Sequence, residues 1–295
     1  MYLNVRETAQ RWCISKGYVC NLCAAGKVPG AFKKDHMWKI PEDAVMPSKN
    51  YHKRNVELFA EVEEKRQKLK RLRILTKGEK KRLADDFMME YIYNSNALSG
   101  NELTFEETGM VLRELMVDPK SRLDQMEVYN HKKAFYLMLD LVDKNIPLSE
   151  DTIKQLHYQI LNDHADDRGI YRKIPIRIQT FNDTVQPYKI QPEMKRLIEN
   201  YVNNSESIIS RLAGFHAEFE KIHPFIDGNG RLGRLLVNFE LMKLGYPPIN
   251  IRYEDRKWYY IAFKEFYKKN DLSMMENLFV VYINEALDQY INIIC

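Results

Sequence analysis

The chain has 295 residues, with 45 Lys and Arg side chains against 41 Asp and Glu side chains, for a formal net charge of +4. Hydrophobic residues make up 45% and charged residues 29%, which is typical of a globular protein and excludes collagen-like and disordered chains. No apolar run approaches the ~20 residues of a membrane-spanning helix, and the first residues contain no apolar signal core. Four cysteines do not make a disulfide framework, so we expect a cytoplasmic protein.

Positive charge is concentrated toward the N-terminus. Residues 1–82 contain 20 Lys and Arg and 9 Asp and Glu, a net charge of +11, whereas residues 83–295 carry a net charge of −7. The two parts therefore differ in electrostatics, and we expect them to have different partners.

The first 48 residues form a small unit of their own in the sequence pattern. Val5–Trp12 has the spacing of a short amphipathic helix, and Ser15 can cap a second helix that ends at Gly26. Two short apolar segments then flank Asp35 and His36, which predicts a hairpin. Helix, turn, helix and hairpin is the order of a winged helix-turn-helix, and the segment resembles the excisionase and MerR-like DNA-binding family.

That resemblance implies a contact with DNA through residues 1–48. The second helix would face the major groove and the hairpin would bind phosphates. The side chains concerned are Lys16, Tyr18 and Asn21 on the helix and Lys33, Lys34 and Lys39 on the hairpin. The alternative is a small basic domain used for protein contacts or dimerisation.

A helical pattern follows and continues, with breaks, to the C-terminus. Residues 49–82 combine apolar positions at helical spacing with a densely charged opposite face, and we interpret them as a helical linker. Residues 83–295 are a run of long helical segments, predicting a mainly α domain. One stretch alternates with a period of two, at Ile174, Ile176 and Ile178, and predicts a hairpin that turns at Asn182–Asp183 and returns to Ile190.

The segment HPFIDGNGRLGR, residues 223–234, combines the groups that phosphoryl-group transfer needs. A helix ends at His223 and another begins near Gly230, so the backbone N–H groups at the new N-terminus can bind an anion. Arg231 and Arg234 are three residues apart and can grip phosphate oxygens. Asp227 suits a Mg²⁺ ion that bridges phosphates, and His223 suits a general base.

At every specified position this segment matches the signature of the Fic family, His-x-Phe-x-(Asp/Glu)-Gly-Asn-Gly-Arg-x-x-Arg. The resemblance implies a Mg²⁺-dependent protein adenylyltransferase, which moves AMP from ATP to a Ser, Thr or Tyr hydroxyl of a protein and releases pyrophosphate. It implies that His223 is the base, that Asp227 is the Mg²⁺ ligand and that Phe225 anchors the loop. The implied nucleotide contacts are Gly228, Asn229 and Gly230 in the anion hole and Arg231 and Arg234 on the β- and γ-phosphates.

Gly230 bears on which phosphate is transferred. The kinase-like branch of the family has Lys at this position, so the resemblance favours transfer of the α-phosphate here. A minority of members use other nucleotides or phosphocholine, and the loop does not exclude them.

The chain departs from the family in the inhibitory motif (Ser/Thr)-x-x-x-Glu-(Gly/Asn). The matching stretch begins at Ser95 and ends at Gly100, with Ser99 in place of the glutamate that pairs with the second arginine. A serine has no charge and too short a side chain for a strong pair with Arg234. We therefore expect inhibition by this route to be weak or absent. Glu102, three residues further on, is an alternative carboxylate for this role, but it would face another side of the turn.

The predicted hairpin, residues 172–188, resembles the flap that aligns the target protein in this family, with Gln179, Thr180 and Phe181 as candidate contacts. A purely structural hairpin is the alternative. The resemblance also makes self-modification and a homo-oligomer reasonable expectations. A second hypothesis is a DNA-binding transcriptional regulator whose Fic-like domain binds nucleotide without turnover.

Overall fold

The computed structural model of the chain describes residues 2–12, 16–24, 26–44, 51–118, 120–161, 166–177 and 184–295. Its buried apolar side chains form two separate clusters. The smaller cluster is formed by residues between Ala9 and Ile40, and the larger cluster by residues between Val62 and Leu287. The N-terminal unit and the helical remainder therefore each have a core of their own.

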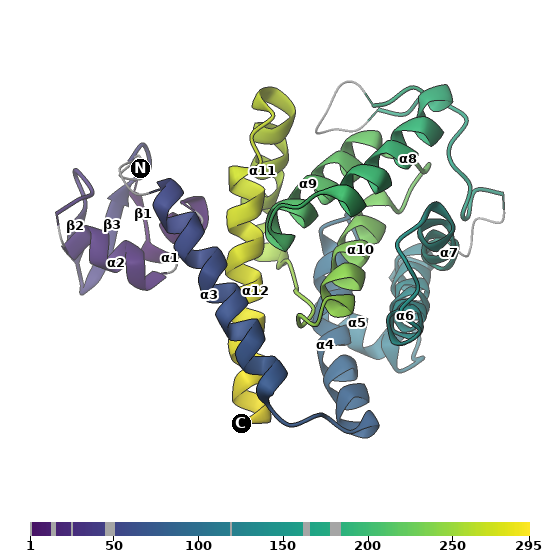
Figure 1. The fold of residues 1–295 in the computed structure, drawn as a ribbon, viewed down its shortest axis with the longest axis horizontal. Coiled ribbons are helices and arrows are strands. Elements are labelled where there is room, and N and C mark those ends of the chain that lie inside the picture. Colours follow the sequence, from purple (N-terminus) through teal and green to yellow (C-terminus); the bar gives the residue numbers. More distant parts are fainter. Residues whose placement is uncertain are drawn as a thin grey trace.

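The N-terminal unit contains two helices and a three-stranded antiparallel sheet in the order β1-β3-β2 (Figure 1). The elements are β1 (Tyr2–Leu3), α1 (Val5–Arg11), α2 (Lys16–Ala24), β2 (Phe32–Lys34) and β3 (Met37–Pro41). Asp35 and His36 form the turn of the hairpin, both with positive φ, as predicted. The strand β1 is too short to be recognised by its pattern. Contact with DNA stays a prediction.

Helix α3 (Tyr51–Arg71) packs along α12 (Ser273–Ile294), so two segments distant in sequence lie side by side (Figure 1). Val62 of α3 is buried in the larger core. Helix α4 (Lys77–Ala97) begins after Thr76, whose hydroxyl caps it in a capping box with Glu79. The predicted end of the linker at residue 82 therefore falls inside α4, and α3 belongs to the packed helical domain.

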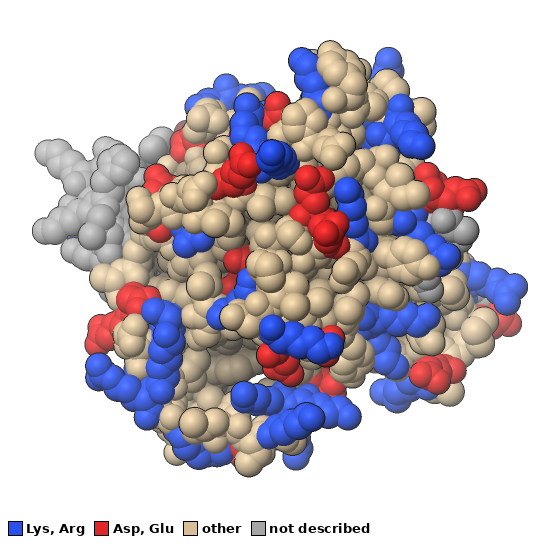
Figure 2. Space-filling model, turned by 45° about the vertical axis from the view of Figure 1, so that its right-hand side comes forward, with Lys and Arg blue, Asp and Glu red and all other residues tan. Residues whose placement is uncertain are grey.

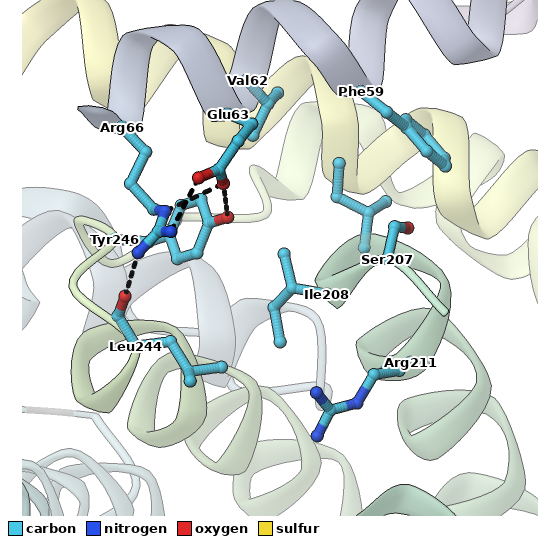
Figure 3. Close-up of a pocket in the computed structure, with 10 residues that line it drawn as sticks. Phe59, Val62, Glu63, Arg66, Ser207, Ile208, Arg211, Leu244 and Tyr246 are labelled. Carbon is cyan, nitrogen blue, oxygen red and sulfur yellow. Dashed lines mark hydrogen bonds and ion pairs between the residues drawn. The ribbon is translucent and has the colours of Figure 1, made fainter. Parts of the chain in front are cut away.

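A polar network attaches α3 to the loop after α10. Arg66 donates two hydrogen bonds to the Glu63 carboxylate and one to the carbonyl of Leu244, and the Tyr246 hydroxyl donates to Glu63 at 2.9 Å. Figure 3 shows these side chains converging beside a cavity of about 350 Å³ under α3. The Arg66 guanidinium lowers the pKa of Glu63 to about 2.

The remaining helices are α5 (Phe105–Leu112), α6 (Arg122–Asp143), α7 (Glu150–Ile160), α8 (Pro187–Asn203), α9 (Ile208–Ile222), α10 (Asn229–Lys243) and α11 (Arg256–Lys269), with a short 3₁₀ turn at Tyr253–Asp255. Helix α10 contacts α4, α6, α7 and α9 and is buried over most of its length. Four of the remaining helices, α5, α6, α7 and α9, are capped at the N-terminus by a hydroxyl side chain. The capping residues are Thr104, Ser121, Ser149 and Ser207. The mainly α prediction is confirmed, and the loop before α10 is fixed in a packed helical core.

The predicted hairpin is wrong in its second arm. Helix α8 begins at Pro187, so the expected return strand to Ile190 is helical instead. Proline has a fixed φ suited to the first position of a helix, and this preference overrides the weak alternation. Residues 178–183, which include Gln179, Thr180 and Phe181, lie outside the described residues. The described arms, 171–177 and 184–186, contain no strand, although the Thr184 hydroxyl joins them by donating to the carbonyl of Ile176.

Among the described residues, no helix is both long enough and apolar enough to cross a membrane. Figure 2 shows a face on which both signs of charge are interspersed, with Lys and Arg gathered along its lower margin.

Candidate active site

The loop between α9 and α10 makes two sharp turns that its residues permit. His223 ends α9 in the left-handed region, with φ of 48°, and Pro224 prevents the helix from continuing. Gly228 precedes α10 with φ of 75°, where a Cβ atom would lie 3.0 Å from the Cγ2 atom of Ile160. A glycine is therefore required at this position. A left-handed histidine is strained, which is typical of functional sites.

Two buried side chains hold the loop in shape. The Asn229 side chain accepts from the backbone N–H of Phe225 and donates to its carbonyl, both at 2.9 Å. The His157 ring stacks on Phe225 with centroids 3.7 Å apart, accepts from the Gly169 N–H at 2.8 Å, and lies 3.0 Å from the carbonyl oxygen of Asp227. Because a carbonyl only accepts, Nε2 of His157 carries the proton. Asn229 thus supports the loop with its side chain, and only its backbone N–H can face an anion.

The loop borders a cavity of about 600 Å³ that gathers most of the predicted site residues. The lining includes His223, Asp227, Gly228, Asn229, Gly230, Arg231, Arg234 and Ser99, together with Glu220 and residues of α11. Phe225 lies beneath the loop and is fully buried. Since the first residue before α10 is Gly228, no side chain caps this helix, and its first N–H groups can bind an anion.

Among the described residues that line this cavity, His223 is the only one with an imidazole. Burial, and secondly the charge of Arg172, lower its pKa to about 4, although the Glu220 carbonyl and Asp227 oppose this change. The ring is therefore neutral at pH 7, and Nδ1 lies 3.3 Å from the Glu220 carbonyl oxygen. The proton belongs on Nδ1 for the same reason as above, which leaves the Nε2 lone pair to accept a proton.

Arg172 fixes the backbone of His223. Its Nε donates to the His223 carbonyl at 2.8 Å, and its other nitrogens donate to the carbonyls of Ile174, Val185 and Ile222. Arg172 is 5% exposed, and these carbonyl oxygens surround its charge in place of a carboxylate. One buried guanidinium thus joins both arms of the predicted flap to the left-handed histidine.

The two arginines of the motif have different surroundings. Arg231 is 2% exposed, and its guanidinium lies 3.0 Å from Asp227 Oδ2 and 3.0 Å from Glu127 Oε1. The side chain of Asp227 is 63% exposed, so its free oxygen faces solvent in the cavity. In this arrangement Arg231 orients the Asp227 carboxylate.

Arg234 contacts the predicted inhibitory stretch. Its Nε donates to Ser95 Oγ at 3.0 Å, and its Nη2 donates to the Ser95 carbonyl at 2.6 Å and to Ser99 Oγ at 2.8 Å. Nη1 lies 3.4 Å from the Tyr259 hydroxyl. The Ser99 hydroxyl reaches Arg234 because the guanidinium itself lies against the end of α4, but it brings no charge to the contact. Glu102 is exposed and does not line the cavity.

Several contributors to this site were missed by the sequence analysis of the motif, namely Glu127, His157 and Glu220. They lie on α6, α7 and α9 and share no local pattern with the loop. Arg172 and Tyr259 lie in stretches that resemble the family, but no role was predicted for either side chain. No signal in a single sequence places these side chains beside residues 223–234, because the contacts depend on helix packing.

The site is thus a glycine-rich loop between two helices, with a neutral histidine on one side and an anion-binding helix N-terminus on the other. Residues 147–241 match the Fic/DOC family model, so the chain carries a Fic domain. It is similar to the protein adenylyltransferase Fic of Nematostella vectensis, at 31% identity over 212 residues, or 69% of this chain and 49% of that protein. The protein adenylyltransferase fic-1 of Caenorhabditis elegans is 32% identical over 58% of this chain and 35% of its own length.

Solved structures share the fold. Fic-1 from C. elegans (residues 134–508) has a TM-score of 0.72 at 23% identity and covers 82% of this chain and 73% of that chain. A Fic-domain-containing signalling protein from Bacteroides thetaiotaomicron has a TM-score of 0.70 at 27% identity and covers 80% of this chain and 96% of that chain. The present chain spans 49% of the length of the Nematostella vectensis relative and 35% of the length of the Caenorhabditis elegans relative.

Proposed function

We propose that this protein is a protein adenylyltransferase that transfers AMP from ATP to a Ser, Thr or Tyr hydroxyl of a protein. The observation that carries the proposal is the placement of neutral His223 on the same cavity as the uncapped N-terminus of α10 and Arg234. The names of the relatives add support.

Each part of the cavity has a task in this reaction. Nε2 of His223 takes the proton from the attacking hydroxyl, whose oxygen bonds to the α-phosphorus while pyrophosphate leaves. The first N–H groups of α10 bind phosphate oxygens, and Arg234 binds the terminal phosphates. A Cβ atom at Gly230 would lie 3.2 Å from Arg234 Nη1, so the glycine leaves this arginine its present position.

Asp227 fits the role of a Mg²⁺ ligand. The described residues contain no group of three or more His, Cys, Asp or Glu side chains suited to a metal, so the protein would supply this single carboxylate. Mg²⁺ commonly binds one or two carboxylates, water and substrate phosphates, and Arg231 already orients Asp227 toward the cavity. When bound, the ion neutralises charge on the phosphates.

The reaction is tested with ATP labelled on the α- or the γ-phosphate. We expect protein-bound label from α-labelled ATP in the presence of Mg²⁺, including label on the protein itself. His223→Ala should abolish labelling while ATP still binds, because the base is separate from the phosphate contacts. His36→Ala, which changes an exposed histidine of the N-terminal hairpin, is the matched control. Label from the γ-position alone, or full activity of His223→Ala, would contradict the proposal.

A further inference from the structure

Glu220 is a buried carboxyl on the last turn of α9 to which the mechanism above assigns no task. It is 8% exposed and lines the active-site cavity. Its Oε1 atom packs against Gly233, where an added Cβ atom would lie 3.0 Å away, and no hydrogen-bond partner for Oε1 exists among the described residues. An unsatisfied carboxyl in such a place is costly, so its position needs a reason.

The carboxyl of Glu220 lies beside the ring of His223. The two residues are three apart, and Oε2 of Glu220 lies 3.6 Å from Nδ1 of His223. This distance is too long for a good hydrogen bond but short enough for a strong ion pair in a buried place. The backbone carbonyl of Glu220 lies closer to the same nitrogen, at 3.3 Å. One residue therefore presents both a carbonyl and a carboxyl to the side of the ring that faces away from the reacting nitrogen.

The surroundings show why a carboxyl here matters. When Nε2 takes a proton, the imidazole becomes a cation in a place where burial and the charge of Arg172 already oppose it. Charged and titratable groups from several elements face the pair. They are Arg172 from the loop after α7, Asp227 from the loop before α10, Arg234 from α10, and Tyr259, Tyr260 and Tyr267 from α11. On α9 itself, the neutral ring of His216 lies against Gly233 beside Oε1 of Glu220. The Glu220 carboxyl lies 3.6 Å from Nδ1 of His223, whereas the Asp227 carboxylate pairs with Arg231.

We propose that Glu220 is a positioning residue that holds the Nδ1-protonated form of His223 and stabilises the imidazolium created during transfer. The inference rests on the proposed adenylyl transfer. In that step the acceptor O–H bond breaks, Nε2–H forms, the acceptor oxygen bonds to the α-phosphorus, and the bond to the pyrophosphate oxygen breaks. The proton on Nε2 then passes to solvent. Glu220 itself exchanges no atom with the substrate.

Burial raises the pKa of Glu220 to about 7. Because Oε2 of Glu220 lies 3.6 Å from Nδ1 of His223, each group favours the charged form of the other, and a proton gained by His223 favours the ionised carboxylate. This coupling supports a role in the chemical step more than in binding of ATP.

The first test compares Glu220→Gln, which keeps the size of the side chain and removes its charge, with Glu220→Asp, which keeps the charge. The matched control is Glu218→Gln, a change of a partly exposed carboxylate on the same helix that pairs with Lys221. We expect Glu220→Gln to lower kcat by about 10- to 100-fold with KM for ATP within about twofold, a fraction of what a general base contributes. Glu220→Asp should restore part of the rate, and Glu218→Gln should leave it unchanged.

The second test measures the imidazole of His223 by nitrogen NMR, with His223→Ala to assign its signals among the seven histidines. We expect the Nδ1–H form, and a lower pKa of His223 in Glu220→Gln than in the unaltered protein. A normal rate in Glu220→Gln, or a reduced rate with an unchanged pKa of His223, overturns the inference. If the unaltered protein transfers no AMP but the pKa still falls in Glu220→Gln, the inference stands and the proposed function fails.

Discussion

Ser99 is the residue at which the sequence analysis predicts a departure from the inhibitory motif of the Fic family. Its hydroxyl accepts from Arg234 at 2.8 Å, so the position is in direct contact with the guanidinium that we assign to the terminal phosphates. A hydroxyl is a neutral acceptor and leaves that guanidinium its charge, whereas a carboxylate in this place would neutralise it. We therefore propose that the site is not strongly inhibited through this contact.

We predict that Ser99→Glu weakens ATP binding and slows AMP transfer by about tenfold or more, because a hydrogen bond to a charged partner contributes about 1.5–3 kcal/mol. The measurements are ATP affinity by calorimetry and the rate of labelling. Ser99→Ala is the control, since it removes the hydroxyl without adding charge, and should stay close to the unaltered rate. Equal rates in the serine and glutamate forms would contradict the prediction.

Candidate site residues could be predicted where they lie within one continuous segment. The pattern of residues 223–234 predicted a base, glycines at an anion hole and two arginines, and the structure gathers these residues at one cavity. The same reasoning placed Asn229 in the anion hole, but it did not predict that the Asn229 side chain binds the backbone of Phe225. Side-chain direction, and the contacts of Arg172 and Glu220 around His223, follow from tertiary packing and have no counterpart in residue type or spacing.

At the scale of elements, long amphipathic helices were predictable and their roles were less so. α3 has a charged face that favours a solvated linker, but its narrow apolar face, which includes Val62, packs into the core beside α12. The start of α8 at Pro187 shows the same limit, because two prolines, Pro187 and Pro192, both suit a helix start and the structure uses the first. Periodicity identifies a face but not what covers it.

Helix α3 provides the next prediction. Val62 is 1% exposed and borders the cavity of about 350 Å³ under α3 (Figure 3). Val62→Ala should lower the free energy of unfolding by about 1–3 kcal/mol, because two methyl groups leave the core beside existing empty space. Urea unfolding measures the change, with Lys68→Ala on the exposed side of α3 as the control. An unchanged midpoint for Val62→Ala would mean that α3 is a linker whose packing adds no stability.

For the whole molecule, the net charge of +4 conceals a basic N-terminal part and an acidic remainder. Attraction of a nucleotide to the acidic part therefore depends on a few placed groups, namely the N-terminus of α10 and Arg234, whose charge the Ser99 hydroxyl leaves intact. The same helical domain buries several histidines away from solvent. Burial lowers the pKa of His157 to about 4, of His216 to about 3 and of His223 to about 4, and lowers that of His131 well below its ordinary value.

These histidines predict loss of stability in mild acid. Each binds a proton in the unfolded chain below about pH 6.5 but stays neutral in the folded protein, so unfolding is favoured as pH falls from 6.5 toward 4. Glu220 acts in the opposite sense, because its pKa of about 7 lets the folded protein bind a proton first. Four histidines against one carboxyl leave a net loss on the order of 2–4 kcal/mol per pH unit below about pH 6.

Urea unfolding at pH 7.5, 6.5 and 5.5 measures this dependence. The folded state should be clearly less stable at pH 5.5 than at pH 7.5, and the exposed His36→Gln variant should show the same slope as the unaltered protein. Equal stability at pH 7.5 and 5.5 would mean that the buried histidines gain protons without unfolding. In that case the pKa of His223 would lie near its ordinary value of about 6.5, and burial would not be what keeps the imidazole neutral.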